Sequence, residues 1–201
     1  MKHKGKTNPP GRVKIIKAFS TLMSQKDFHS ITTAQIASNA EVTEGLIYKY
    51  FKDKKDLLYQ VLNEHFVKFH TKIEKRIADE TTCVKQLEII IFSSLESYVQ
   101  NRIFSKILLL EVRNSLDFFE SDAYKMVRRY TRTILNIIEK GVKSGELKPD
   151  LDARILRKVI LGAIEHACLG EVIFGKEIEI KIDIDKLAAD ISKIVFTGAK
   201  S

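Results

Sequence analysis

The chain has few of the features that mark secreted, membrane or catalytic proteins. Cys83 and Cys168 are the only cysteines among its 201 residues, and their separation matches no metal-ligand spacing. We therefore expect two reduced thiols in a helical core and no disulfide. The longest apolar runs, such as Ile89–Phe92 and Ile107–Leu110, are far shorter than the ~20 residues that span a bilayer. The basic N-terminus lacks the apolar segment of a secretory signal, so we expect a cytoplasmic protein with no membrane segment.

Catalytic signatures are also scarce. The sequence contains no G-x-S-x-G, P-loop or G-x-G-x-x-G pattern. His65 and His70 lie five residues apart, so they would not share a helix face well, and His166 and Cys168 diverge in the same way. We expect no catalytic residue, no metal site and no cofactor other than a possible effector ligand. A helical enzyme, or a scaffold without a ligand, is the alternative class.

Positive charge is concentrated near the N-terminus. The net charge is +8, and residues 1–60 hold 11 lysine and arginine residues against 5 acidic ones. The other 141 residues hold 23 basic residues against 21 acidic ones. A polyanionic partner is therefore favoured near the N-terminus, although a solvated basic surface would give the same distribution.

Residues 32–56, TTAQIASNAEVTEGLIYKYFKDKKD, predict a helix-turn-helix. Two short apolar-periodic runs flank the polar break Asn39–Val42, which is too short for anything but a sharp turn. Thr32 or Thr33 can cap the first helix, and Thr43 can cap the second, because a hydroxyl accepts from an unpaired N–H of the opening turn. The second helix of such a unit enters the DNA major groove.

Apolar residues recur at helical spacing along the rest of the chain, which predicts an all-α protein with about nine helices. The first helix is expected to bury Val13, Ile16, Ala18, Phe19, Leu22 and Met23. Further helices are expected over about 53–78, 81–100, 102–112, 121–143, 151–174 and 184–197. We expect a break at Ser115–Ser121, a left-handed cap at Gly145 and an extended loop at Glu177–Asp185. The predicted domains are a flexible basic arm (1–10), a helix-turn-helix domain (11–56) and a ligand-binding and dimerisation domain (57–201).

Residues 12–59 resemble the N-terminal domain of the TetR family of transcriptional repressors. The stretches ITTAQIASNAEV and TEGLIYKYFKDKKDLL carry the match. Glu41 departs from the family pattern, which usually has Gly in the turn, and would cost about 1 kcal/mol if its φ is positive. The resemblance implies a homodimer on a palindromic operator and a ligand that lowers operator affinity.

The resemblance also implies which residues contact DNA: Thr33, Thr43, Glu44, Gly45, Tyr48, Lys49, Tyr50 and Lys54. Thr33 and Lys54 would contact phosphates, and Tyr50 would lie near the backbone. The others would face the groove, with Lys49 suited to guanine and Glu44 to a cytosine amino group. Simple solvent exposure is the alternative for each groove residue.

LLLEVRNS (Leu108–Ser115) and Ile134–Ala167 resemble the branch of the family that represses fatty-acid degradation and responds to long-chain acyl-CoA. An apolar site would be lined by Phe66, Phe69, Phe92, Phe104, Leu108, Val112 and Phe118, with Arg113 beside it. These residues would equally suit a packed core. A TetR-like regulator that senses another hydrophobic or cationic compound, as in efflux control, is the alternative within the family.

Lys125, Arg128, Arg129 and Arg132 recur on one face of the expected helix 121–143. Such a face could bind the nucleotide and phosphates of CoA, because arginine pairs with phosphate bidentately, or it could be solvated. The last two long helices carry broad apolar faces with small residues. In the family they form a four-helix dimer interface, and their spacing fits that role.

Overall fold

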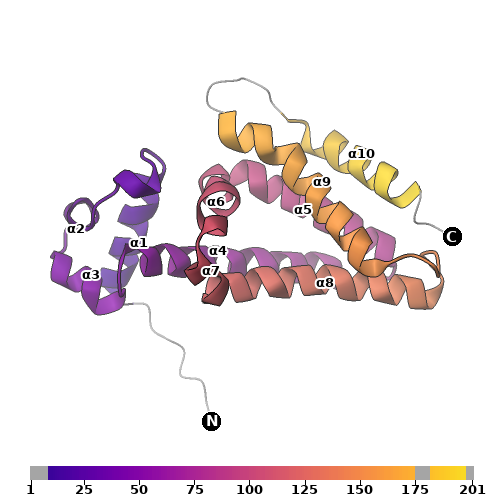
Figure 1. The fold of residues 1–201 in the computed structure, drawn as a ribbon, viewed down its shortest axis with the longest axis horizontal. Helices are drawn as coiled ribbons and strands as arrows, with labels where there is room; N and C mark the ends of the chain where they lie inside the picture. Colours follow the sequence, from indigo (N-terminus) through magenta and orange to yellow (C-terminus); the bar gives the residue numbers. More distant parts are fainter. Residues whose placement is uncertain (1–8, 175–181, 198–201) are drawn as a thin grey trace, which may run out of the picture. The chain divides into compact units, whose positions relative to one another are not determined.

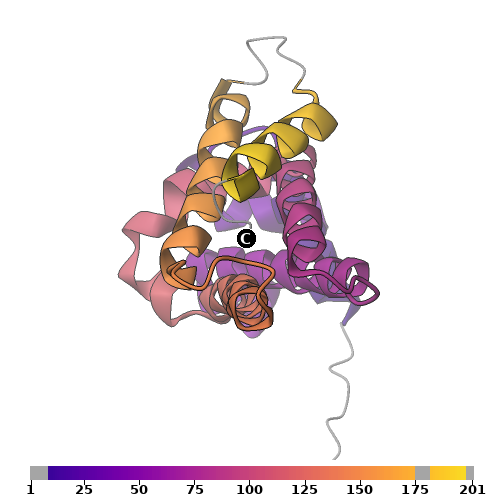
Figure 2. The same ribbon diagram turned by 90° about the vertical axis from the view of Figure 1, so that its right-hand side faces the viewer.

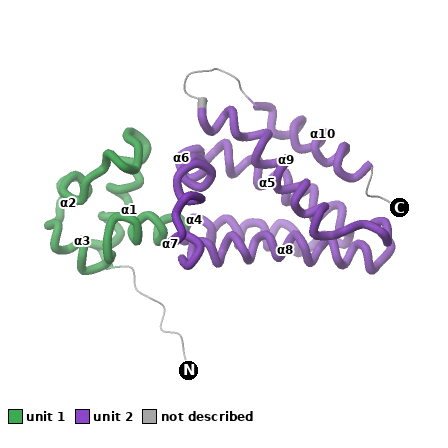
Figure 3. Tube along the Cα trace, in the orientation of Figure 1, with its two compact units in different colours: residues 1–62 green, residues 63–201 purple. Residues whose placement is uncertain are grey.

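The computed structural model describes residues 9–174 and 182–197 (Figure 1), and within these ranges the chain is all-α, as predicted, with no strand. The chain divides into two compact units, Met1–Leu62 and Asn63–Ser201 (Figure 3). The division after Leu62 falls inside a helix that begins at residue 54. The predicted domain boundary, after residue 56, lies earlier in the same helix. Residues 1–8 of the predicted arm and most of the predicted loop 177–185 lie outside the described ranges. No helix in these ranges is long and apolar enough to cross a membrane.

Unit 1 contains α1 (Pro10–Met23), α2 (Thr33–Ala40), α3 (Glu44–Tyr50) and the start of α4 (Lys54–Ile77), with a 3-10 turn at Phe28–Ser30. Its core is built from buried apolar side chains of every element. Ile15 and Phe19 are fully buried, whereas Val13, which we expected in the core, is 47% exposed. The buried face of α1 thus runs through Ile15, Ala18 and Leu22.

The turn between α2 and α3 follows from a small number of backbone contacts. Thr32 and Gln35 form a reciprocal capping box at the start of α2. At its end, Glu41 adopts the left-handed conformation with φ 54° and ψ 48°. The N–H of Glu41 bonds to the Ser38 carbonyl and that of Val42 to the Ala37 carbonyl, which is a Schellman motif. The helix-turn-helix therefore forms as predicted, with Glu41 in the strained position.

Of the two caps predicted for α3 and α4, only the cap of α4 forms. Thr43 precedes α3, but its side chain makes no cap hydrogen bond, so that expectation was wrong. Asp53 accepts from the N–H of Asp56 at 2.8 Å and begins α4 as predicted. Arg12 reaches Gln60 at 2.9 Å and ties α1 to α4 inside unit 1.

Unit 2 holds the rest of α4 together with the remaining helices. These are α5 (Cys83–Gln100), α6 (Arg102–Lys106), α7 (Leu116–Glu120), α8 (Asp122–Ser144), α9 (Ala153–Phe174) and α10 (Ile184–Thr197). α8 runs beside α4, and α10 packs over α5 and α9 (Figures 1 and 2). Ile90, Ile134 and Ile160, from α5, α8 and α9, are fully buried in the shared core.

The segment between α5 and α8 departs from the prediction of one helix followed by a break. α6 is only five residues long and passes into a π turn, Ile107–Glu111, and a 3-10 turn, Val112–Asn114. The expected break holds α7 instead. Apolar runs of this density do not fix a single helical pitch, because several turns bury the same side chains. π and 3-10 turns inside helical segments recur at functional sites.

The turn after α8 is a supporting element of unit 2. Gly145 has φ 81°, the predicted left-handed cap. Glu146 follows it and accepts from the backbone N–H groups of Cys83 and Val84 at 2.8 and 2.9 Å. These are the unpaired donors of the first turn of α5, so Glu146 caps a distant helix. Burial, and then the nearby Glu146 carboxylate, raise the pKa of the Cys83 thiol to about 12, so the thiol is neutral at pH 7.

Candidate functional site

The solvent face of α3 carries most of the predicted DNA-contacting residues. Tyr48 is 54% exposed although it is a large aromatic residue, and Glu44 and Lys49 are exposed beside it. The opposite face buries Ile47 completely. α3 therefore presents an aromatic ring, a cation and a carboxylate from one short helix that the core of unit 1 holds in place.

Gly45 lies on this face without a structural need for glycine. A Cβ built there would meet only the Thr43 Oγ1 atom, at 4.0 Å, so unit 1 leaves the space open. Gly11 differs, because a Cβ there would come within 2.9 Å of Leu46. Glycine at position 45 thus suits the close approach of something outside the unit.

Thr33, Tyr50 and Lys54 differ from the exposed residues of α3. Thr33 and Tyr50 are partly buried, and the Tyr50 ring lies edge-on to Phe51 at 6.4 Å. The Lys54 ammonium donates to the carbonyls of Phe28 at 2.9 Å and Ile31 at 2.7 Å. It approaches the His29 carbonyl at 3.4 Å and lies 4.4 Å from the centre of the Phe28 ring.

The hydrogen bonds of the Lys54 ammonium are therefore made within unit 1. An ammonium has three donors, and three carbonyls of one turn surround this one. Burial also lowers its pKa. The geometry argues against a free phosphate contact and favours a role in holding the turn before α2.

A pocket of about 300 Å³ lies inside unit 2, between α4, α5, the α6–α7 segment, α8 and α9. Its volume is at the lower end of the range of small-molecule sites. Its wall is mostly aromatic and aliphatic. The predicted residues on it are Phe66, Phe69, Phe104, Leu108, Arg113 and Phe118.

Several residues of this wall were not foreseen from the sequence. They include Tyr98 and Tyr130 on α5 and α8, and Leu161, Ile164 and Glu165 on α9. Helical periodicity shows only that these positions face inward. Whether an inward position lines a pocket or a packed seam depends on the separation of the helices.

The polar groups on the pocket wall are mostly paired or neutral. Ser94 donates to the Ile90 carbonyl at 2.6 Å, which leaves its oxygen to accept from the Tyr130 hydroxyl at 2.7 Å. Burial raises the pKa of Tyr130 to about 12. Burial, aided by Lys68, lowers the pKa of His65 to about 4, so its ring is neutral at pH 7. That ring stacks on Phe104 at 4.5 Å.

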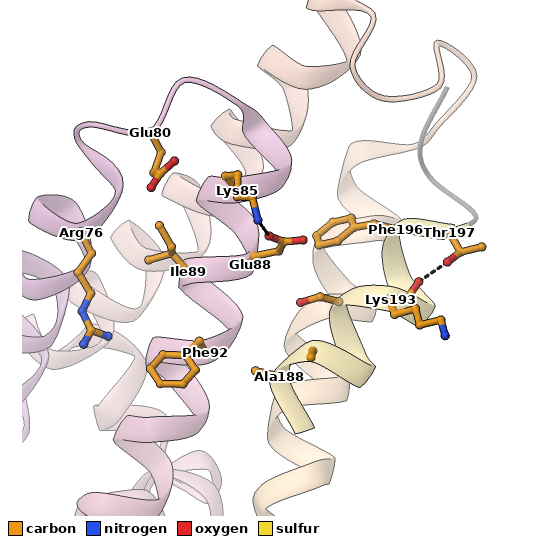
Figure 4. Close-up of a pocket in the computed structure, with 12 residues that line it drawn as sticks. Arg76, Glu80, Lys85, Glu88, Ile89, Phe92, Ala188, Lys193, Phe196 and Thr197 are labelled. Atoms are coloured by element: carbon orange, nitrogen blue, oxygen red, sulfur yellow. Dashed lines mark hydrogen bonds and ion pairs between the residues drawn. The ribbon is translucent and has the colours of Figure 1, made fainter. Parts of the chain in front are cut away.

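Two predicted ligand residues lie elsewhere. Val112 is buried in the 3-10 turn and does not line the pocket. Phe92 faces a different groove of about 780 Å³ between α5 and α10, where it lies near Ile89 and Ala188 (Figure 4). Lys85 and Glu88 form an ion pair at 2.8 Å on the wall of that groove. Helical spacing places Phe92 inward but does not say which of two spaces it faces.

A cationic groove of about 530 Å³ adjoins the apolar pocket, since Tyr124 and Thr131 line both. The other residues of the groove are Lys125, Arg128, Arg129, Arg132 and Arg157. The first four form the predicted face of α8. Arg157 comes from α9 and was missed, because its sequence position gives no sign that it lies opposite that face.

The cations of this groove are not equally available. Lys125 pairs with Asp122 at 2.7 Å, and Arg129 pairs with Glu74 at 2.8 Å. Arg128, Arg132 and Arg157 have no acidic partner within 4 Å among the described residues. The groove therefore carries uncompensated positive charge next to an apolar pocket.

The outer face of α9 is apolar and exposed. Ile155 and Val159 are 52% and 50% exposed, and Gly162 and Gly170 are exposed on the same side. Ile194 of α10 is more exposed still. Contiguous apolar exposure with small residues is typical of helix surfaces that pack against a partner.

Comparison with known families covers nearly the whole chain. Residues 15–61 match the family described as "Bacterial regulatory proteins, tetR family". Residues 62–198 match the family described as "YsiA-like protein, C-terminal region". The first match holds the helix-turn-helix, and the second holds the apolar pocket and the cationic groove.

Individual relatives also match the chain over nearly its full length. The chain is 25% identical to the fatty acid metabolism regulator protein of Bacillus subtilis, over 96% of this chain and 97% of the relative. The structure of the transcriptional regulator FadR from Bacillus subtilis in complex with stearoyl-CoA matches with a TM-score of 0.81 at 25% identity, covering 92% and 98% of the two chains. FadR from Bacillus halodurans matches with a TM-score of 0.82, covering 96% and 97%; at 22% identity this supports the fold alone.

Proposed function

Because the chain belongs to the TetR family of DNA-binding transcriptional regulators, which are not enzymes, we propose that it is a repressor released from its operator by a long-chain acyl-CoA. The observation that carries the proposal is the junction of an apolar pocket with a cationic groove. A repressor acts where the chromosome is, so we place it in the cytoplasm.

The two parts of the site match the two parts of an acyl-CoA. An acyl chain is apolar and gains free energy from every methylene that it buries, about 0.8 kcal/mol each. The pocket offers a largely aromatic wall for it. The similar regulator from Bacillus subtilis binds stearoyl-CoA, which supports an effector of the same class here.

The anionic part of the ligand would occupy the groove. Arg128 and Arg132 lie one turn apart on α8, and Arg157 faces them from α9. Arginine forks bind phosphate oxygens bidentately, and the paired Lys125 and Arg129 would contribute less. A cationic effector, the alternative within the family, would be repelled here.

The DNA half of the proposal rests on the exposed face of α3. Tyr48 would pack on the sugar-phosphate backbone, and Lys49 and Glu44 would read base edges in the major groove. Gly45 leaves room for close approach and Thr43 would face the groove, whereas Thr33 and Tyr50 would contact the backbone. Lys54 would act indirectly, by fixing the turn before α2.

A homodimer would place two such helices on a palindromic operator, about 34–36 Å apart. The exposed Ile155 and Val159 of α9, with Ile194 of α10, supply an apolar surface suited to self-association. α4 begins in unit 1 and continues into unit 2, so it is the covalent route between ligand and DNA. Only a ligand that binds one conformation more tightly than the other can shift operator affinity.

Isothermal titration with hexadecanoyl-CoA tests the ligand half of the proposal. The wild-type chain should bind it, and Arg157→Ala and Arg128→Ala should each weaken binding by about tenfold, because each removes a phosphate partner. Lys140→Ala, an exposed cation beyond the groove on α8, is the matched control and should bind as wild type does. Equal affinity of all four proteins would disprove the assignment of the groove.

A further inference from the structure

Apart from tyrosines, the described wall of the apolar pocket carries three ionisable side chains: His65, Arg113 and Glu165. His65 is neutral at pH 7, because burial lowers its pKa to about 4. Arg113 and Glu165 carry opposite charges and bind each other, with Arg113 Nη2 donating to Glu165 Oε1 at 2.5 Å. The described wall of the pocket therefore carries no net charge, in contrast to the adjoining groove.

The pair bridges two elements of the wall. Arg113 belongs to the 3-10 turn Val112–Asn114, and Glu165 belongs to α9. The side chains are 45% and 31% exposed, so a ligand can reach them. Arg113 has five N–H donors and spends one on this bond, which leaves donors for a neutral acceptor without breaking the pair.

The position of the pair suits the neutral middle of an acyl thioester. Arg157, Leu161 and Glu165 follow one face of α9, and the eight residue steps from first to last span about 12 Å. Arg157 lies in the groove and Leu161 in the pocket. A ligand with phosphates at Arg157 would thus place uncharged amide or thioester groups, and not its phosphates, beside Glu165.

A free carboxylate would meet different conditions at the same place. It would have to leave water for an apolar pocket, which is costly unless an unpaired cation receives it. The Arg113 cation is already neutralised, and the Glu165 carboxylate would repel a second negative charge. An ester or thioester of the same chain carries no charge and escapes both costs.

We propose that Glu165, by holding Arg113, makes the pocket select neutral acyl derivatives over the free fatty acid of the same chain length. The inference rests on the proposed function, since it concerns the head group of an effector bound in this pocket. It goes beyond the proposed function because it assigns the exclusion of free fatty acids to one residue, Glu165, and to the negative charge of its carboxylate.

Titration calorimetry at about pH 8, where a fatty acid is ionised, tests this with a charged and a neutral ligand of the same acyl chain length. Decanoate and methyl decanoate are titrated into wild type, Glu165→Gln, Arg113→Gln and the control Glu139→Gln, an exposed carboxylate on α8 outside the pocket. Wild type and the control should bind the ester at least about tenfold more tightly than the carboxylate.

The two pocket variants should shift carboxylate binding in opposite directions. Glu165→Gln frees the Arg113 cation and should strengthen decanoate binding by about tenfold, while ester binding changes less than about threefold. Arg113→Gln leaves Glu165 uncompensated and should weaken decanoate binding further. A pair that only holds the wall together would instead weaken both ligands in both variants.

Equal binding of the two ligands by wild type overturns the inference, as does an unchanged decanoate affinity in Glu165→Gln. Circular dichroism verifies the fold of each variant. If Glu165→Gln does not fold, the decanoate and ester affinities of Arg113→Gln decide the question. Hexadecanoyl-CoA is titrated into wild type in parallel. Its failure to bind would overturn the proposed function, whereas its binding together with equal decanoate and ester affinities overturns only the selectivity.

Discussion

Among the described residues, Glu41 is the only non-glycine residue with a positive φ. Its left-handed conformation costs an L-residue about 1 kcal/mol or more, and its ion pair with Lys14, at 3.5 Å between exposed side chains, returns little. Glu41→Gly should therefore raise the free energy of unfolding by about 1 kcal/mol in urea titrations. Ala34→Gly, on the exposed face of α2, is the control and should lower it by a similar amount. A lower free energy of unfolding in Glu41→Gly would show that the left-handed conformation of Glu41 does not destabilise the fold.

His65 links the pocket to pH. Its pKa falls from 6.5 to about 4 on folding, so the unfolded chain binds more protons between these values and stability rises with pH across that window. Acidification from pH 7 to about 4 should cost roughly 3 kcal/mol through this group. His65→Phe keeps the stacking on Phe104 and should remove most of that loss in urea titrations at several pH values, whereas His166→Gln, at an exposed site, should not. A variant with the wild-type pH profile would show that the ring is not desolvated.

Lys54 and Lys49 should differ in what their removal does to DNA binding. Lys54 donates to backbone carbonyls, so Lys54→Ala should lower the melting temperature of unit 1 and leave the salt dependence of operator affinity unchanged. Lys49 is exposed on α3, and Lys49→Ala should lower the salt slope by about one unit if it neutralises a phosphate. Fluorescence anisotropy at several salt concentrations gives both slopes. A lower salt slope of operator affinity for Lys54→Ala would show instead that Lys54 contacts a phosphate.

The start of α5 at Cys83 is capped by Glu146, 63 positions further along the chain. Glu146 accepts from the first N–H groups of α5 with two charge-assisted bonds, so Glu146→Ala should lower the free energy of unfolding by about 2 kcal/mol. Glu139→Ala, at an exposed site on α8, should have little effect. Urea titration followed by circular dichroism measures both, and equal stability of the two variants would show that the cap contributes nothing.

Elements with strong local signals were predictable from the sequence. The hydroxyl cap at Thr32, the cap at Asp53 and the left-handed Gly145 each depend on residues within one or two turns. The long-range partners were not predictable. Nothing near Glu146 or Arg157 in the sequence indicates which distant helix each one faces.

The candidate site divides in the same way. Aromatic density between residues 66 and 118 left open whether these side chains line a site or pack as a core, and the structure places most of them around a pocket. The recurrence of cations on α8 predicted a charged face, and that face lines the groove. The separation of Phe92 from the pocket depends on how α5 packs between α9 and α10. The α6–α7 segment was mispredicted because its apolar run is compatible with α, π and 3-10 turns alike.

The proposed dimer depends on the outer face of α9. Val159→Glu puts a charge into an apolar surface that would be buried by self-association, so the variant should become monomeric in analytical ultracentrifugation. Its operator affinity should fall by at least about tenfold, because only a dimer engages both half-sites. Lys158→Glu, at the neighbouring exposed position, is the control for charge. A dimeric Val159→Glu would place the interface elsewhere.

The proposed function requires that an acyl-CoA in unit 2 lowers the affinity of unit 1 for DNA. The most direct measurement is the operator Kd, by fluorescence anisotropy, with and without saturating hexadecanoyl-CoA, and with CoA alone as the control. Hexadecanoyl-CoA should raise the Kd by about tenfold or more, within the usual range of coupling between sites, and CoA alone should not. An operator Kd that is unchanged while hexadecanoyl-CoA is demonstrably bound would contradict the proposed function.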